Sequence, residues 1–200
     1  MRRALAKVAL VALVGCGHRM AQSSEGKNPT HTVMPSQSDD AQSGIIYGDD
    51  HAYALTAPKG WVLDNQVWAD QGIFAVFYPK GSSAKGNWVA YSRVMDLNPK
   101  GLLAAATADL ESIRQESPHY SWRRLPDLHT SDKSTALVFS ASGDSFGNAE
   151  FLAYIQAPTK VVFICAVTRT PKNLERLREP FEAIVRSYAW FTDKVITPKP

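Results

Sequence analysis

The short connections between strand-like runs constrain what this 200-residue chain can fold into more than any other feature. Each connection holds Pro, Gly or Ser, for example at 58–60, 79–83 and 157–160, and these residues favour tight turns. Antiparallel strands can be joined by a hairpin, whereas parallel neighbours need a crossover of a dozen or more residues. The sequence therefore predicts a mostly antiparallel sheet built from the runs at 52–57, 73–78, 88–95, 121–126, 134–142, 149–157 and 160–168.

Two segments have the periodicity of amphipathic helices. Asn98 and Pro99 form a cap-and-proline signal, and a one-sided apolar stripe follows that ends near residues 117–118. Thr170 and Pro171 repeat the signal, and Pro180 inside the second stripe predicts a kink or a restart of that helix. The stripes consist of Leu102, Leu103, Ala106, Leu110 and Ile113, and of Leu174, Leu177, Phe181, Ile184, Val185 and Tyr188.

The nearly continuous apolar run VVFICAV at 161–167 predicts a central strand that is covered on both faces. Its Cys165 is then a buried core residue, and the alternative interpretation is a reactive thiol. Together with the two helical stripes, this pattern predicts the α+β class, with two principal helices packed on the faces of a mostly antiparallel sheet.

The N-terminus resembles the signal of a bacterial lipoprotein. Arg2 and Arg3 precede the short apolar run VALVALV at 8–14, which is too short to span a bilayer. The sequence LVGC at 13–16 resembles the lipobox, and the resemblance implies that Cys16 receives a diacylglycerol and becomes the acylated N-terminus. Two or three acyl chains anchor a protein stably, whereas one does not. The alternative is a plain secretory signal in which Cys16 is incidental.

The resemblance also bears on location. The mature protein is expected in a bacterial cell envelope, facing the periplasm. Gly17 follows the cysteine where an inner-membrane retention signal usually has Asp. In a bacterium with two membranes, the outer membrane is therefore the expected destination.

Composition divides the chain into four parts. Residues 1–15 are the expected signal peptide, 16–44 a lipidated tether, 45–193 the domain and 194–200 a flexible tail. Residues 17–44 contain no Phe, Tyr, Trp, Leu or Ile, so the tether is expected to be disordered. Removing residues 1–15 takes away three basic residues and leaves 19 basic against 19 acidic residues, a net charge of zero. This balance argues against nucleic acid as a partner.

The order of the predicted elements resembles the PsbP-like fold, which is shared by a photosystem II extrinsic subunit and by small bacterial lipoproteins such as DcrB. The markers are the turn PKGW at 58–61 and the ending FEAIVRSY at 181–188. The resemblance covers about residues 45–191 and implies an α-β-α sandwich with a role in binding or assembly, usually without catalysis. It implies no photosynthetic function, because no metal- or subunit-contacting residue of that subunit can be matched here.

The sequence carries no recognised catalytic motif. The patterns G-x-S-x-G, G-x-G-x-x-G and H-E-x-x-H and the phosphate-binding P-loop are absent. The histidines of the domain, at 51, 119 and 129, are isolated, although a triad assembled from distant residues stays open. We therefore expect no enzyme, no cofactor and no metal. The acidic residues Asp49, Asp50, Asp64 and Asp70 are interpreted as solvated turn residues, with a divalent-cation patch as the alternative.

Tryptophans are the remaining candidates for contacts. Trp61 and Trp190 are expected to anchor loop and helix to the sheet, whereas Trp68 and Trp88 are expected to be more exposed. Trp122 precedes Arg123 and Arg124, which suits either an anion-binding spot or an edge strand protected by charge.

The 79–87 connection is longer than a tight hairpin requires. It presents Lys80 and Lys85 beside Trp88, and these three residues are the candidate contacts for an anionic or extended partner. The alternative is an unconstrained surface loop.

These observations favour a membrane-anchored lipoprotein with a non-catalytic binding or assembly domain and an envelope protein as its partner. Two alternatives stay open. A carrier of a small apolar ligand requires a cavity lined by aromatic residues, and an unrecognised hydrolase requires titratable residues that converge in a cleft.

Overall fold

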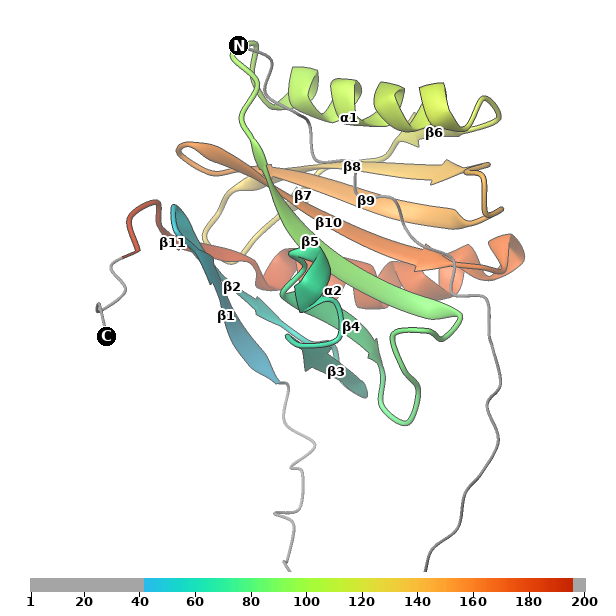
Figure 1. Cartoon of the computed structure of the whole chain (residues 1–200), viewed down its shortest axis with the longest axis horizontal. Coiled ribbons are helices and arrows are strands. Elements are labelled where there is room, and N and C mark those ends of the chain that lie inside the picture. The colour runs from blue at the N-terminus through green and yellow to red at the C-terminus, as the bar shows by residue number, and fades with distance from the viewer. Residues whose placement is uncertain (1–41, 196–200) are drawn as a thin grey trace, which may run out of the picture. The chain divides into compact units, whose positions relative to one another are not determined.

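The computed structural model describes residues 42–195 and contains two antiparallel sheets and two α-helices (Figure 1). The predictions for the signal peptide, for Cys16 and for the tether up to residue 41 lie outside the described residues, as does the tail from 196. The strand bounds are β1 Ser43–Gly48, β2 His51–Thr56, β3 Trp61–Asp64, β4 Ala75–Pro79, β5 Trp88–Asp96, β6 Ser121–Arg124, β7 Leu128–His129, β8 Thr135–Ser142, β9 Ala149–Gln156, β10 Lys160–Thr168 and β11 Ala189–Thr192.

The larger sheet has eight strands in the order β3-β4-β5-β10-β9-β8-β6, with β7 paired to β8. All of its strand pairs are antiparallel, as the short connections predicted. The apolar strand β10 lies between β5 and β9, and its residues from Val161 to Ala166 are buried. The prediction of a central strand covered on both faces is confirmed.

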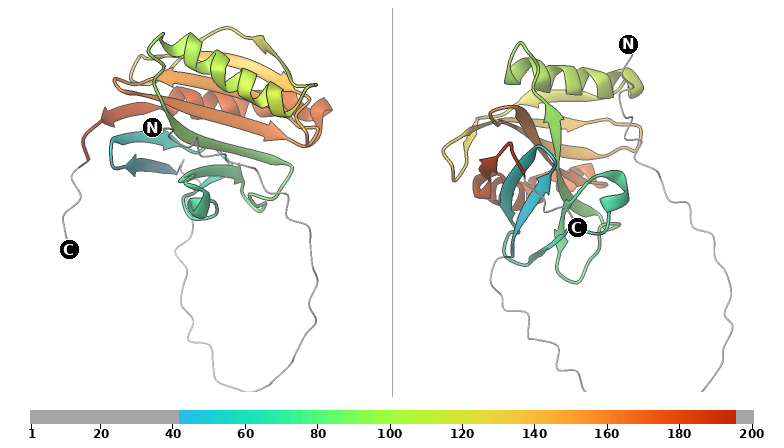
Figure 2. Two further views of the ribbon diagram at one scale, coloured as in Figure 1. Left: turned by 45° about the horizontal axis from the view of Figure 1, so that its top comes forward. Right: turned by 60° about the vertical axis from the view of Figure 1, so that its left-hand side comes forward.

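Helix α1 (Leu102–Glu116) covers one face of the larger sheet (Figure 2). Its buried residues Ala105, Ala106 and Leu110 pack against Leu152 and Cys165. The expected cap is wrong in detail, because the helix begins after Gly101. Asn98 instead closes a tight turn, in which its carbonyl accepts from the Gly101 amide at 2.8 Å and its side chain accepts from the Lys100 amide at 2.9 Å.

The second helical segment restarts, as Pro180 predicted. Pro171 opens the 3₁₀ helix η2 (Pro171–Leu177), and α2 (Arg178–Ser187) follows with Pro180 in its first turn. A proline is tolerated there because the first amides of a helix have no intrahelical acceptor. Phe181, Ile184 and Val185 of α2 are buried on the face of the larger sheet opposite to α1 (Figure 2).

The smaller sheet, with the order β1-β2-β11, shares that face with α2. Its inner residues Ile46, Tyr53 and Leu55 belong to the same core as Phe181, and the Tyr53 hydroxyl meets Ser92 Oγ on β5 at 2.8 Å. The sequence predicted one sheet only, so this second sheet is a correction. β1 begins at Ser43, within the segment assigned to the tether. No helix among the described residues is long and apolar enough to cross a bilayer.

Candidate interaction surface

The outward side of the smaller sheet is uncharged and carries large, exposed apolar side chains. Ile45 and Tyr47 of β1 are 63% and 60% exposed, and Phe191, at an irregularity in β11, is 54% exposed. We call this side the outer face; its residues are Ser43, Ile45, Tyr47, Ala52, Ala54, Thr56, Ala189, Phe191 and Thr192.

Antiparallel sheets that face water usually carry polar residues on that side. Here the cross-strand rows run from Ile45 through Ala54 to Ala189 and from Tyr47 through Ala52 to Thr192. Small alanines thus occupy the middle strand beside the larger side chains of Ile45 and Tyr47 on β1. Large apolar side chains exposed on one side of a sheet are typical of a contact surface.

The outer edge of β1 adds backbone groups that pair with no other described strand to the same surface. Among the described strands β1 pairs with β2 alone, and its sequence SGIIYG carries no charge. Proteins usually protect such edges with charged residues, irregularities or covering loops.

The edges at β6 and β11 have that protection. Arg123 and Arg124 lie on the edge strand β6, which confirms that interpretation of the pair. The arginine that stacks on Trp122 is neither Arg123 nor Arg124. It is Arg114 of α1, whose guanidinium lies 5.3 Å from the centre of the indole ring. On β11 the Trp190 amide donates to Asp132 Oδ2 at 2.9 Å, so a side chain covers that edge.

The structure separates the three candidate contacts of the 79–87 connection. Lys80 and Lys85 are exposed. Trp88 is half-buried, and its ring packs against the core on the α2 side. Trp68 is also partly covered, because it meets Tyr91 edge-on with 5.8 Å between ring centroids.

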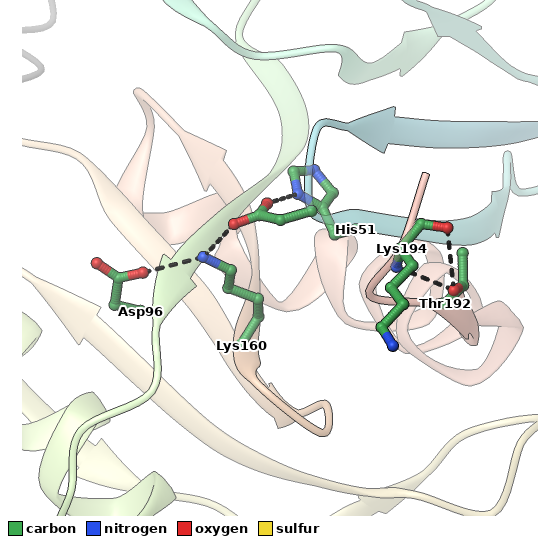
Figure 3. Close-up of polar contacts among 6 residues, drawn as sticks. His51, Asp96, Lys160, Thr192 and Lys194 are labelled. Carbon is green, nitrogen blue, oxygen red and sulfur yellow. Dashed lines mark hydrogen bonds and ion pairs between the residues drawn. The ribbon is translucent and has the colours of Figure 1, made fainter. Parts of the chain in front are cut away.

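The four aspartates considered for a cation do not form a common site. Two of them, Asp50 and Asp64, bind other groups of the protein. Asp50 accepts Lys160 Nζ at 2.6 Å and His51 Nδ1 at 3.0 Å, and Lys160 also reaches Asp96 at 3.1 Å (Figure 3). The hydrogen bond from Lys160, followed by that from His51, lowers the pKa of Asp50.

Asp64 accepts hydrogen bonds from the Tyr78 hydroxyl and from two backbone amides. Within residues 42–195, no three His, Cys, Asp or Glu side chains gather in a way that could hold a metal ion.

Polar side chains form a network under α1 that the sequence analysis missed. Asp109 Oδ1 and Oδ2 accept from Arg93 at 2.7 Å and from the Tyr154 hydroxyl at 2.9 Å. Nearby, the hydroxyl of Tyr120 donates to Glu150 at 3.0 Å. Because these residues lie far apart in the sequence, no motif brings them together.

The chemistry open to this network is limited. Burial raises the pKa of Glu150 to about 7, although the hydrogen bond from Tyr120 opposes the shift. Burial also raises the pKa of Cys165 well above its usual range, so the thiol stays protonated and is a poor nucleophile. Its exposed fraction is 1%, which agrees with a core residue.

The Glu150 carboxyl is expected to make stability fall as the pH rises. Its pKa is raised from the usual 4.5 to about 7 in the folded state, so the folded chain binds this proton more tightly than the unfolded chain. We therefore compare the free energy of unfolding of Glu150→Gln with that of wild type at two pH values. We expect this difference to shift in favour of the variant by about 2 kcal/mol when the pH is raised from about 5 to about 8, because only wild type loses stability there. Denaturant unfolding at both pH values measures this difference. Glu111→Gln on the surface of α1 is the control, and an equal gain there would contradict the assignment.

A shallow groove along α2 has a volume of about 420 Å³. It does not have the aromatic lining that a carrier of an apolar ligand requires. Its lining residues are Glu175, Arg178, Glu179, Glu182, Ala183 and Arg186, and several of them pair along the helix, such as Arg186 with Glu182 at 3.1 Å. The groove therefore resembles a charged, solvated helix surface.

Comparisons with known proteins bear on the fold. No protein-family model matches the chain, and no curated protein sequence is detectably similar to it. The solution structure of cyanobacterial PsbP (CyanoP) from Synechocystis superposes with a TM-score of 0.52 at 10% identity, over 82% of this chain and 100% of that one. The Saccharomyces cerevisiae Ran-binding protein Mog1p gives a TM-score of 0.45 at 12% identity, over 76% of this chain and 96% of that one. The domain thus has the α+β fold of PsbP-like proteins, as the sequence resemblance predicted.

Proposed function

We propose that this chain is a membrane-anchored envelope lipoprotein whose domain binds or helps to assemble other envelope proteins and performs no catalysis. The uncharged outer face carries the proposal, because an antiparallel sheet with large apolar residues on its water side is costly to leave uncovered. The PsbP-like fold supports a binding or assembly role.

The proposed anchor is Cys16, on the resemblance of residues 13–16 to a lipobox. The chain enters the described domain at β1, the strand that carries Ile45 and Tyr47. The sequence predicts a disordered tether between Cys16 and this strand, and a disordered segment of that length spans roughly 30 Å on average. The outer face would therefore be held close to the membrane, where an envelope partner is within reach.

The titratable groups fit a non-catalytic domain better than a hydrolase. Glu150 meets Tyr120 under α1, and Cys165 is buried in the core. Both carboxylate oxygens of Asp109 accept hydrogen bonds, one from Arg93 and one from Tyr154. Within residues 42–195 these hydrogen bonds join α1 and the connection after it to the sheet, which is a structural role.

Cross-linking in native membranes, followed by affinity capture of the tagged full chain, tests the proposal. We expect an envelope protein to be captured with wild type, and Phe191→Ser to reduce its recovery by about tenfold, since a buried aromatic anchor is worth about 1–2 kcal/mol in a contact. Phe146→Ser is the matched control, because Phe146 is 53% exposed but lies in the β8–β9 connection. Mass spectrometry of the same material is expected to find the N-terminus at acylated Cys16.

The same experiment tests whether Lys80 and Lys85 contact the partner, with a separate variant. Lys80→Ser with Lys85→Ser removes two exposed charges, whereas Trp88 is left intact because its ring packs against the core. Equal recovery with wild type, Phe191→Ser and the double lysine variant would contradict both candidate surfaces. An unmodified Cys16 would contradict the anchor.

A further inference from the structure

We propose that a second copy of this chain pairs with the exposed edge of β1, so that two smaller sheets join into one six-stranded antiparallel sheet. This inference rests on the proposed function, because it names the occupant of one part of the same binding surface. The observation behind it is that β1 is an uncharged edge strand with two exposed apolar side chains, whereas β6 and β11 are protected.

The strand is complementary to itself. Consider an antiparallel pair of β1 strands with a two-fold axis at Ile46. Residue 46 of one copy then lies opposite residue 46 of the other, 45 opposite 47, 44 opposite 48 and 43 opposite 49. Outward side chains stay on the outer face and inward ones on the inner face. Ile45 of each copy then faces Tyr47 of the other on the outer face, and the two Ile46 residues meet on the inner face. Pairs of an aromatic with a β-branched residue are among the favourable cross-strand contacts.

No like charges oppose each other in this register. The first acidic residue, Asp49, lies opposite Ser43 of the other copy, so the two acidic turns are at opposite ends of the paired strands. The chain from residue 16 has no net charge, so two copies do not repel each other through their overall charge.

The sequence of the segment before the described domain differs in kind from β1. Residues 17–41, which precede the described domain, contain no Phe, Tyr, Trp, Leu or Ile. Their largest apolar side chains are those of Met20 and Met34, and they have no aromatic residue to set against Ile45 or Tyr47. Anchoring of both copies to one membrane would raise their effective concentration at each other, which favours a pairing that is weak in dilute solution.

Sedimentation of the chain from residue 17 onward tests the pairing without the anchor. We expect a monomer–dimer equilibrium, in which Ile45→Lys or Tyr47→Lys raises the dissociation constant about tenfold or more, because each substitution removes two symmetric contacts and places charges on the joined edge. Leu103→Lys on α1 is the matched control, since Leu103 is 58% exposed, and should leave the dissociation constant unchanged. Melting curves check that all variants fold.

Cysteine cross-linking tests the register. Because Ile45 faces Tyr47 of the other copy, a mixture of the Ile45→Cys and Tyr47→Cys variants should form a disulfide under mild oxidation. Each variant alone should cross-link far less, since identical positions are offset along the strands. The buried Cys165 provides the background level in the otherwise wild-type chain.

The outcomes are separable from those of the envelope-capture experiment. A wild-type chain that stays monomeric at the highest concentrations, or an Ile45→Lys variant that dimerises like wild type, would overturn the pairing and leave the envelope-partner proposal standing. A dimer that dissociates on Ile45→Lys while capture is insensitive to Phe191→Ser supports the pairing and counts against the wider outer face as a partner site.

Discussion

Gly143→Ala is expected to lower the free energy of unfolding by about 3 kcal/mol, or the melting temperature by roughly 10 °C. Gly143 follows β8 with φ of 88°, a left-handed conformation that costs an alanine about 1 kcal/mol. A Cβ there would also lie 2.3 Å from the carbonyl oxygen of His119. Because that neighbour is backbone, the connection between α1 and β6 must move to accommodate the methyl group.

Gly147→Ala separates the two causes. Gly147 lies in the same β8–β9 connection with φ of 72°, but a Cβ there would meet nothing within 4 Å. We expect it to cost about 1 kcal/mol, the conformational part alone. Denaturant unfolding of the two variants measures the difference, and equal losses would show that the close approach to His119 carries no energetic weight.

Six of the eight strands of the larger sheet and both helices could be predicted because their signals are local, whereas the short strands β3 and β7 were missed. Turn residues set the hairpins, and the periodicity of the stripes set α1 and α2. Of the smaller sheet only β2 was predicted as a strand, at 52–57; the sheet itself could not be predicted in this way, because it joins strands from the two ends of the domain. β11 pairs with β2 from more than a hundred residues away, and β1 contains two glycines in six residues, which weakens its strand signal.

The candidate interaction surface likewise has one part that local sequence signals predicted and one part that depends on distant segments. The exposed lysines and the protected edge β6 were predicted from short stretches of sequence. The outer face depends on β11 and β1 flanking β2, and only the tertiary structure determines that arrangement. A signal was nevertheless present in β1, since the run SGIIYG has apolar residues but no charge at a domain boundary.

The sequence contains only a weak signal for the hydrogen-bond network around Asp109. Asp109 lies at the margin of an apolar helical stripe, next to Leu110, and Arg93 is the one charged residue within the run WVAYSRVM. Charges at such positions usually have a buried partner. The identity of the partner depends on how α1 lies across β5 and β9, which no local pattern specifies.

Asp109→Ala is expected to cost about 3 kcal/mol, because it leaves two partners unsatisfied under α1. The Asp109 side chain is only 17% exposed, and that of Arg93 is 31% exposed. Arg93 also lies 4.7 Å above the ring of Phe163, so the guanidinium cannot turn to water without losing that contact. Tyr154 is fully buried, and its hydroxyl would lose its acceptor.

Glu111→Ala on the same helix is the control for this prediction. Glu111 pairs with Arg114, and their side chains are 36% and 53% exposed. An exposed pair of this kind contributes about 0.5 kcal/mol or less, so the helix should lose little when it is removed. Asp109→Asn should fall between the two, because an amide oxygen still accepts one hydrogen bond but carries no charge opposite Arg93. If Asp109→Ala proves no more costly than Glu111→Ala, the network does not hold α1 to the sheet, and apolar packing of Ala106 and Leu110 alone fixes the helix.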